Sequence, residues 1–133
     1  MAKSIIKDKS EALAVRIVRL SRYLTTTKRE FIISGQIYRS GTSISANVNE
    51  AQQGSSKNDF VHKMNIALKE ASETKHWLRL LYKTDYINKI QFDSIYGDAT
   101  EVEKILTKIV KTTRENIEKE EKERKRESND KMD

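Results

Sequence analysis

Residues 60–81 repeat an apolar or small side chain at alternating steps of four and three. These positions are Phe60, Met64, Ala67, Ala71, Thr74, Leu78 and Leu81. On an α-helix such steps return to the same side, so the stretch predicts a helix with one narrow apolar seam. A second stretch keeps this spacing at Phe92, Ile95, Ala99, Val102, Leu106, Ile109 and Thr113. Two such seams indicate helices that pack side by side.

The sequence also predicts where these two helices begin and end. We expect Ser55 or Ser56 to cap the first of them, because serine oxygens accept hydrogen bonds from free N–H groups at helix starts. That helix should end near Thr84 and Asp85. The next helix is expected to begin near Gln91, or alternatively after Gly97 and Asp98, and its seam fades beyond Ile117.

Two further helices are expected earlier in the chain. The first is expected to run from near Ser10, a candidate N-cap, or from an earlier residue, to Thr25, where three consecutive threonines disfavour a helix. Its seam is Leu13, Ile17, Leu20 and Leu24. The second runs from Lys28 to about Gln53. Its seam is Ile33, Ile37, Ser40, Ile44, Val48 and Ala51.

The middle of that second helix is built from unusually small residues. They are Ser40, Gly41, Ser43, Ser45 and Ala46. A glycine inside a helix costs roughly 1 kcal/mol relative to alanine. We therefore expect a neighbouring helix to approach closely at Gly41 and offset that cost. A break in the helix at this point is the alternative.

Few residues in the chain favour turns, since its 133 residues include no proline and four glycines. This length suits one domain. The expected fold is an all-α, antiparallel up-down-up-down four-helix bundle over residues 1–117. Residues 118–133 carry six Lys/Arg and seven Asp/Glu. Glutamates that precede lysine or arginine by four residues favour a helical extension of the last helix, and a disordered tail is the alternative.

Several functional classes are disfavoured by what the sequence lacks. Without cysteine there can be no disulfide, thiol nucleophile or thiolate metal site. The first ten residues lack the apolar core of a signal peptide, and no apolar run is long enough to span a membrane. We therefore expect a cytoplasmic protein that does not bind a membrane.

No catalytic or metal-binding constellation is evident. Bundles that hold two metal ions place Glu-x-x-His motifs on two different helices. Here Glu73-x-x-His76 and the looser Asp59-x-x-His62 share one predicted helix and lie about 21 Å apart. No serine has an acid–base partner or a nucleophile-elbow motif. We expect no enzyme activity, cofactor, metal or small-molecule substrate, although a metal site between subunits is left open.

Positive charge is concentrated in the first 53 residues. That segment holds nine Lys/Arg against four Asp/Glu, and the whole chain has a net charge of +6. Such a surface attracts phosphate backbones. The candidate nucleic-acid-binding residues, for RNA or DNA, are Arg16, Arg19, Arg22, Lys28 and Arg29. A basic surface that only aids solubility is the alternative.

The helix at 60–81 also has apolar residues opposite its seam, at Ile66, Trp77 and Leu80. A helix that is apolar on two sides commonly has two partners, and tryptophan is enriched in interfaces. We expect these residues to form the interface of a homo-oligomer. Singly exposed apolar residues are also ordinary, which is the alternative interpretation.

One ordered set of residues resembles a known family. The set begins with Arg39-Ser40-Gly41-Thr42-Ser43-Ile44, Ala46-Asn47-Val48 and Glu50-Ala51. It continues with Ser56-Lys57, Asp59-Phe60, Ile66-Ala67, Lys69-Glu70, Glu73-Thr74 and Trp77-Leu78. This pattern resembles the bacterial four-helix-bundle family associated with intervening sequences in 23S ribosomal RNA genes. Many members have proline where this chain has Ser45 and glycine where it has Ala51, so a helix kink there is a weaker expectation.

The resemblance implies a left-handed antiparallel bundle that assembles as a ring, a homopentamer. It supplies no catalytic residues, and the family's biochemical role is not established. A bundle of similar fold, the accessory variability determinant of diversity-generating retroelements, is a basic pentamer that associates with nucleic acid and a reverse transcriptase. By analogy at the level of fold, RNA binding is the expected function, and a protein-interaction scaffold without nucleic-acid binding is the alternative.

Overall fold

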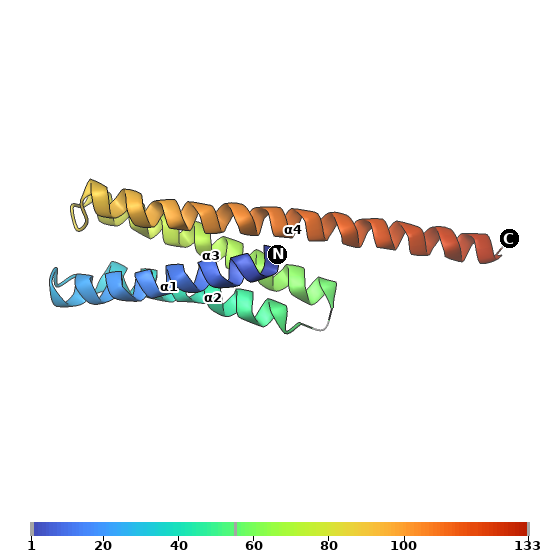
Figure 1. Ribbon diagram of the computed structural model, residues 1–133, viewed down its shortest axis with the longest axis horizontal. Helices are drawn as coiled ribbons and strands as arrows, with labels where there is room; N and C mark the ends of the chain where they lie inside the picture. Colours follow the sequence, from blue (N-terminus) through green and yellow to red (C-terminus); the bar gives the residue numbers. More distant parts are fainter. Residues whose placement is uncertain (1, 55, 133) are drawn as a thin grey trace.

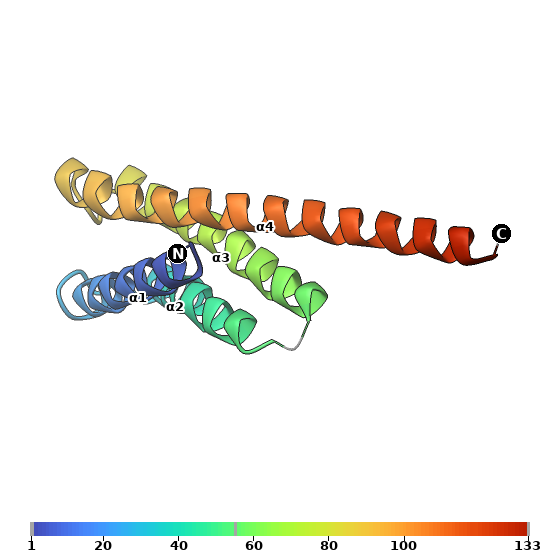
Figure 2. The same ribbon diagram turned by 45° about the vertical axis from the view of Figure 1, so that its right-hand side comes forward.

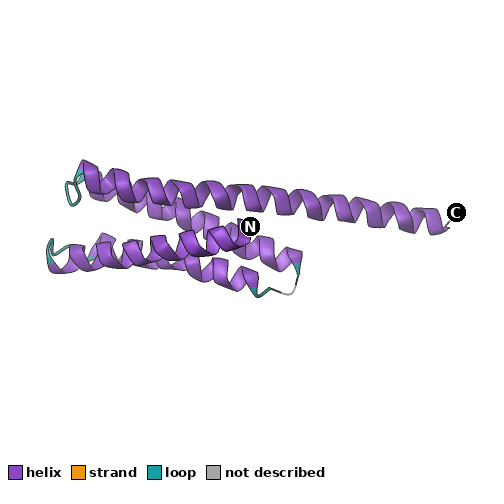
Figure 3. Cartoon of the chain, in the orientation of Figure 1, coloured by secondary structure: helices purple, strands orange, loops and turns teal. Residues whose placement is uncertain are grey.

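The protein is seen in a computed structural model that describes residues 2–54 and 56–132. Helix α1 spans Ala2–Thr26, α2 spans Ile32–Gln52, α3 spans Lys57–Lys83 and α4 spans Lys89–Met132. Successive helices run in opposite directions, and the turns after α1 and α3 lie at the same end of the bundle (Figure 1). The described residues contain no strand (Figure 3). The predicted all-α four-helix bundle is confirmed.

The four predicted seams meet in one core. All seven seam residues of α3 are buried, as are Leu13, Ile17 and Leu24 of α1. In α4 the seam is buried at Ile95, Ala99, Val102 and Leu106, and Val110 is buried where the pattern placed Ile109. The residues that α2 buries in the core are Ser34, Ile37, Ser40, Gly41, Ile44, Val48 and Ala51. Helical periodicity alone therefore located nearly all of the core.

The small residues of α2 permit close packing on two sides. A Cβ atom placed on Gly41 would lie 2.6 Å from Cγ2 of Ile17 in α1, which is well inside van der Waals contact. On the neighbouring side, the Thr74 hydroxyl of α3 donates a hydrogen bond of 2.9 Å to the buried Ser40 hydroxyl. Helix α2 continues through this point without a break. The predicted close approach is confirmed, and at Gly41 the approaching helix is α1.

Ser10 is not the N-cap of α1, which starts earlier, and the predicted start of α2 is wrong. Helix α1 begins at Ala2 because its seam extends back through the buried Ile6, and Ser10 lies inside the helix, where its hydroxyl donates to the Lys7 carbonyl. Helix α2 begins at Ile32 instead of Lys28. Residues 28–31 form a turn in which Arg29 has a φ of 58°. A residue in this left-handed conformation cannot continue an α-helix.

The starts of α3 and α4 have recognisable caps. The Ser56 hydroxyl accepts a hydrogen bond from the Asp59 N–H, as predicted, and Ser55 lies outside the described residues. At α4, the Asn88 side chain accepts from the Gln91 N–H, and the Gln91 side chain accepts from the Asn88 N–H. This reciprocal pair is a capping box, and it explains why α4 begins at Lys89, before Gly97 and Asp98.

Helix α4 runs far past the other three helices (Figure 2). Ile117 is its last half-buried residue, and every described residue after it is exposed. The charged extension is helical as far as Met132. Helices α1 and α4 contact each other less than the other neighbouring pairs do. No helix within residues 2–54 and 56–132 is both long and apolar enough to cross a membrane.

Candidate nucleic-acid interface

The turn between α1 and α2 is held by hydrogen bonds on both sides. The Glu30 N–H donates 2.9 Å to the Leu24 carbonyl at the end of α1. The Glu30 carboxylate then accepts from the N–H groups of Ile32, Ile33 and Ser34, at 3.1, 3.0 and 2.7 Å. Because those are free donors of the first turn of α2, Glu30 caps the helix. The residue is 8% exposed, so the turn has a buried polar anchor.

Four of the five predicted nucleic-acid-binding residues are exposed around this turn. Arg19 and Arg22 lie on the last turns of α1, and Lys28 and Arg29 lie in the turn itself. Within residues 2–54 and 56–132 none of the four forms an ion pair with a carboxylate. Their charges are therefore not neutralised by an acid among these residues. A surface that binds phosphates needs such unneutralised cations.

Arg16 is placed differently from the other four. Its guanidinium donates 2.6 Å to Asp98 and 2.9 Å to Ser94, both on α4. It therefore joins the neighbouring pair of helices with the weakest contact. Lys9 forms a similar link with Glu101 of α4, at 2.5 Å. Arg16 is already occupied by protein groups, so of the five candidates Arg19, Arg22, Lys28 and Arg29 are the ones without an ion pair among the described residues.

Each cation of the turn lies beside an aromatic ring. The Lys28 ammonium is 6.0 Å from the centre of the Tyr23 ring, and the Arg29 guanidinium carbon is 5.6 Å from that of Phe31. These are distances at which the cation and the ring attract each other. Arg19 and Arg22 flank a shallow hollow of about 400 Å³ on the outer side of α1, beside Val15 and Val18. The candidate surface thus combines cations with exposed apolar groups.

The sequence of this chain matches a known protein family. The model of the family described as 23S rRNA-intervening sequence protein matches residues 2–108. The chain belongs to this family. The match covers the bundle and ends inside α4, before the exposed extension.

A solved structure is similar over the same region. It is a crystal structure of a protein of unknown function from the S23 ribosomal protein family of Bacteroides thetaiotaomicron VPI-5482, with 52% sequence identity and a TM-score of 0.82. The match covers 84% of this chain and 99% of that one. No curated protein matches the chain. The family and its solved member support the fold and name no catalytic activity.

The predicted oligomer-interface residues lie on the outer side of α3. Ile66, Trp77 and Leu80 are all half-buried in the single chain. The Trp77 indole N–H donates 3.4 Å to Glu73, which also accepts from Arg39 of α2 at 2.9 Å. Trp77 is therefore held in one orientation with part of its ring exposed. No finding tests the interface, which stays a prediction.

Glu70 adds a polar group to this side of the bundle. Its carboxylate lies 3.6 Å from the Arg39 guanidinium, and one of its oxygens is buried without a hydrogen bond. Burial raises the pKa of Glu70, and the nearby Arg39 charge lowers it by less. The carboxylate forms an ion pair with Arg39 across the α2–α3 contact.

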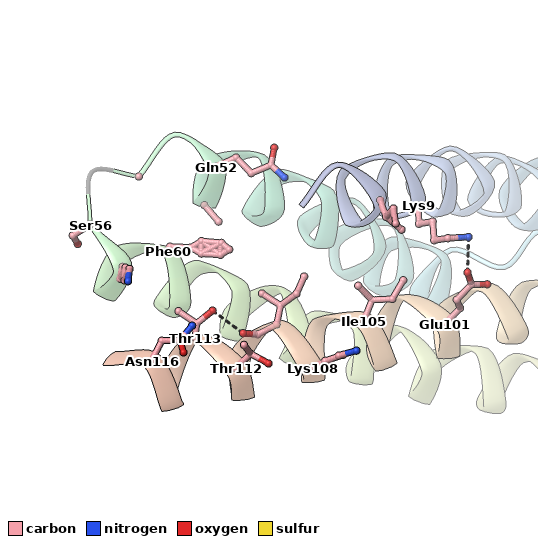
Figure 4. Close-up of a pocket in the computed structure, with 15 residues that line it drawn as sticks. Lys9, Gln52, Ser56, Phe60, Glu101, Ile105, Lys108, Thr112, Thr113 and Asn116 are labelled. Carbon is pink, nitrogen blue, oxygen red and sulfur yellow. Dashed lines mark hydrogen bonds and ion pairs between the residues drawn. The ribbon is translucent and has the colours of Figure 1, made fainter. Parts of the chain in front are cut away.

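A groove of about 1110 Å³ opens at the opposite end of the bundle, between α4 and the other helices (Figure 4). Its floor is apolar, with Phe60, Ile105 and Ile109 among its residues. On its rim, Lys9 pairs with Glu101, and Lys57 with Glu120. Among the described residues no group of three or more His, Asp or Glu side chains could hold a metal ion. The groove is thus an apolar surface whose rim charges are largely neutralised.

Two residues of the candidate surface were missed from the sequence. Glu30 was not recognised as the cap of α2, although an acidic residue just before the apolar pair Ile32-Ile33 is a known helix-start signal. Phe31 was not singled out either. Its signal was the basic pair Lys28-Arg29, which lies between the aromatic residues Tyr23 and Phe31.

Proposed function

We propose that this family member is a non-enzymatic homo-oligomer that binds RNA through the cations at the α1–α2 end. The observation that carries the proposal is the group of four exposed cations without acidic partners, Arg19, Arg22, Lys28 and Arg29. Arg16, the fifth candidate from the sequence, is paired with Asp98 and is not part of this group. The 23S rRNA in the family's description favours RNA over DNA.

The expected binding energy comes mainly from released counterions. Each phosphate that a lysine or arginine neutralises frees condensed cations, so affinity falls as salt rises. Four contacts to a single strand predict a loss of roughly 50-fold between about 50 and 200 mM salt. An oligomer would present the surface once per subunit, and a ring such as the pentamer implied by the family resemblance would increase the avidity.

Binding of purified protein to fragments of ribosomal RNA across this salt range tests the proposal. We expect binding at low salt that weakens steeply as salt is raised. No binding at low salt, or an affinity that salt does not change, would contradict it.

Oligomerisation through α3 gives a separate prediction. Trp77→Ala is expected to shift the assembly to smaller species, because it removes the largest partly exposed apolar side chain on the outer side of α3. Light scattering measures the mass. Tyr38→Ala, which removes an aromatic ring that is 48% exposed on α2, is the matched control and should leave the mass unchanged. A folded Trp77→Ala protein of wild-type mass would count against the interface.

The second candidate function is a protein-interaction scaffold that does not bind nucleic acid. The apolar groove between α4 and the other helices favours it, because grooves of this kind accept amphipathic helices. Purification from cells after nuclease treatment separates the two functions. A single stoichiometric protein partner, with no RNA affinity of the purified chain, would support the scaffold and exclude RNA binding.

A further inference from the structure

Phe31 is an aromatic residue that the bundle does not use. It is the N-cap residue of α2, but its side chain makes no capping hydrogen bond. The ring is 59% exposed and is not among the residues packed against the core. The ring is therefore accessible to a ligand beside Arg29, which forms no ion pair among the described residues.

The backbone on both sides of Phe31 is held by hydrogen bonds. Arg29 adopts a φ of 58°, a conformation that a residue with a side chain seldom takes. The hydrogen bonds of Glu30 to α1 and α2 hold the backbone on both sides of it. The Phe31 ring and the Arg29 guanidinium, 5.6 Å apart, are therefore carried on a backbone that is held in place.

We propose that the turn at residues 28–31 binds single-stranded RNA, with one unpaired base stacked on Phe31 and phosphates held by Lys28 and Arg29. This inference rests on the proposed RNA binding and specifies its substrate class. Proteins that bind single strands combine a basic track for the backbone with aromatic rings on which bases stack. In a duplex the base faces are covered by neighbouring pairs, so Phe31 would have no base to contact.

Charge favours RNA over an apolar partner at this turn. Arg29 lies beside the Phe31 ring, and Lys28 lies beside Tyr23 in the same segment. An apolar protein surface covering Phe31 would strip water from the adjacent Arg29 without supplying a counter-charge. An RNA strand offers an apolar base face and an anionic backbone within one nucleotide. It therefore satisfies the ring and the cations together.

The experiment measures the affinity of the full chain for three short RNA ligands of equal length. These are an unstructured single strand, the same strand with its bases removed, and a duplex. We expect the wild type to bind the intact strand at least about five-fold more tightly than the strand without bases, the lower end of what one stacked base contributes. Phe31→Leu should remove that difference, and Phe31→Tyr should keep it because the ring is retained.

A matched control separates stacking from a general change at this end of the bundle. Ile32 is the next residue and is 79% exposed, so Ile32→Ala should bind all three ligands as the wild type does. Thermal melting of each variant shows that the fold is intact. Stacking on Phe31 is excluded if Phe31→Leu still binds the intact strand more tightly than the strand without bases. It is also excluded if the wild type binds these two strands equally well. In either case, binding of the phosphates stands. If no variant or wild type binds any of the ligands, the proposed function itself fails.

Discussion

Replacing Gly41 with valine is expected to lower the free energy of unfolding by about 2–3 kcal/mol, the usual range for overpacking a tight contact. The added Cβ would lie 2.6 and 2.8 Å from the two γ-carbons of Ile17 and 3.0 Å from its Cβ. Those atoms belong to a fully buried, β-branched side chain that has little freedom to move aside. Helices α1 and α2 would have to separate, and the core at Ile17 would loosen.

Thermal unfolding followed by circular dichroism measures this effect, with an expected fall in Tm of about 6–15 °C for a domain of this size. Gly35→Val is the matched control in the same helix, since a Cβ on Gly35 meets nothing within 4 Å. It should be neutral or slightly stabilising. In the Ile17→Ala background, Gly41→Val should cost less, because the clashing atoms are gone. A Gly41→Val protein as stable as Gly35→Val would contradict the close α1–α2 packing.

Replacing Glu30 with alanine is expected to destabilise the protein by about 2–3 kcal/mol. The substitution removes the acceptor of three N–H groups at the start of α2, and hydrogen bonds to a charged group are each stronger than neutral ones. The site is buried, so water replaces the carboxylate only in part. Glu30→Gln should cost less than Glu30→Ala, because its side-chain carbonyl can still accept.

Denaturant unfolding of the same variants measures the loss, with Glu11→Ala as the control, since Glu11 is an exposed carboxylate on α1. Glu30→Ala should also weaken RNA binding, because the turn that carries Lys28 and Arg29 would lose its anchor. If Glu30→Ala proves no less stable than Glu11→Ala, the carboxylate is not the cap that fixes the turn.

The fold was predictable because the interior of a bundle follows helical periodicity. The α3 seam from Phe60 to Leu81 is buried throughout, and the small residues around Gly41 correctly indicated close packing. Helix boundaries were less predictable, because they depend on local hydrogen bonds. Ser10 was read as a cap although the buried Ile6 extends the seam before it.

The candidate site was predictable only as a set of charges. Sequence position grouped Arg16 with Arg19 and Arg22, but Arg16 is paired with Asp98, which lies 82 residues later in the chain. No local pattern reveals a contact of that range, because it depends on how α1 and α4 pack. The role that we propose for Phe31 likewise rests on its exposure and on its distance to Arg29, which the sequence does not show.

The measurement that tests the account most directly is the salt dependence of RNA affinity in two variants with equal loss of charge. One replaces Arg19, Arg22, Lys28 and Arg29 with glutamine. The control replaces the exposed cations of α4 with glutamine, at Lys104, Lys108, Lys111 and Arg114. For single-stranded RNA, the first variant should lower the slope of log affinity against log salt by about 2.8. The control should keep most of the wild-type slope. Equal slopes for the two variants, or a wild-type slope in the first, would show that RNA is not bound at the α1–α2 end.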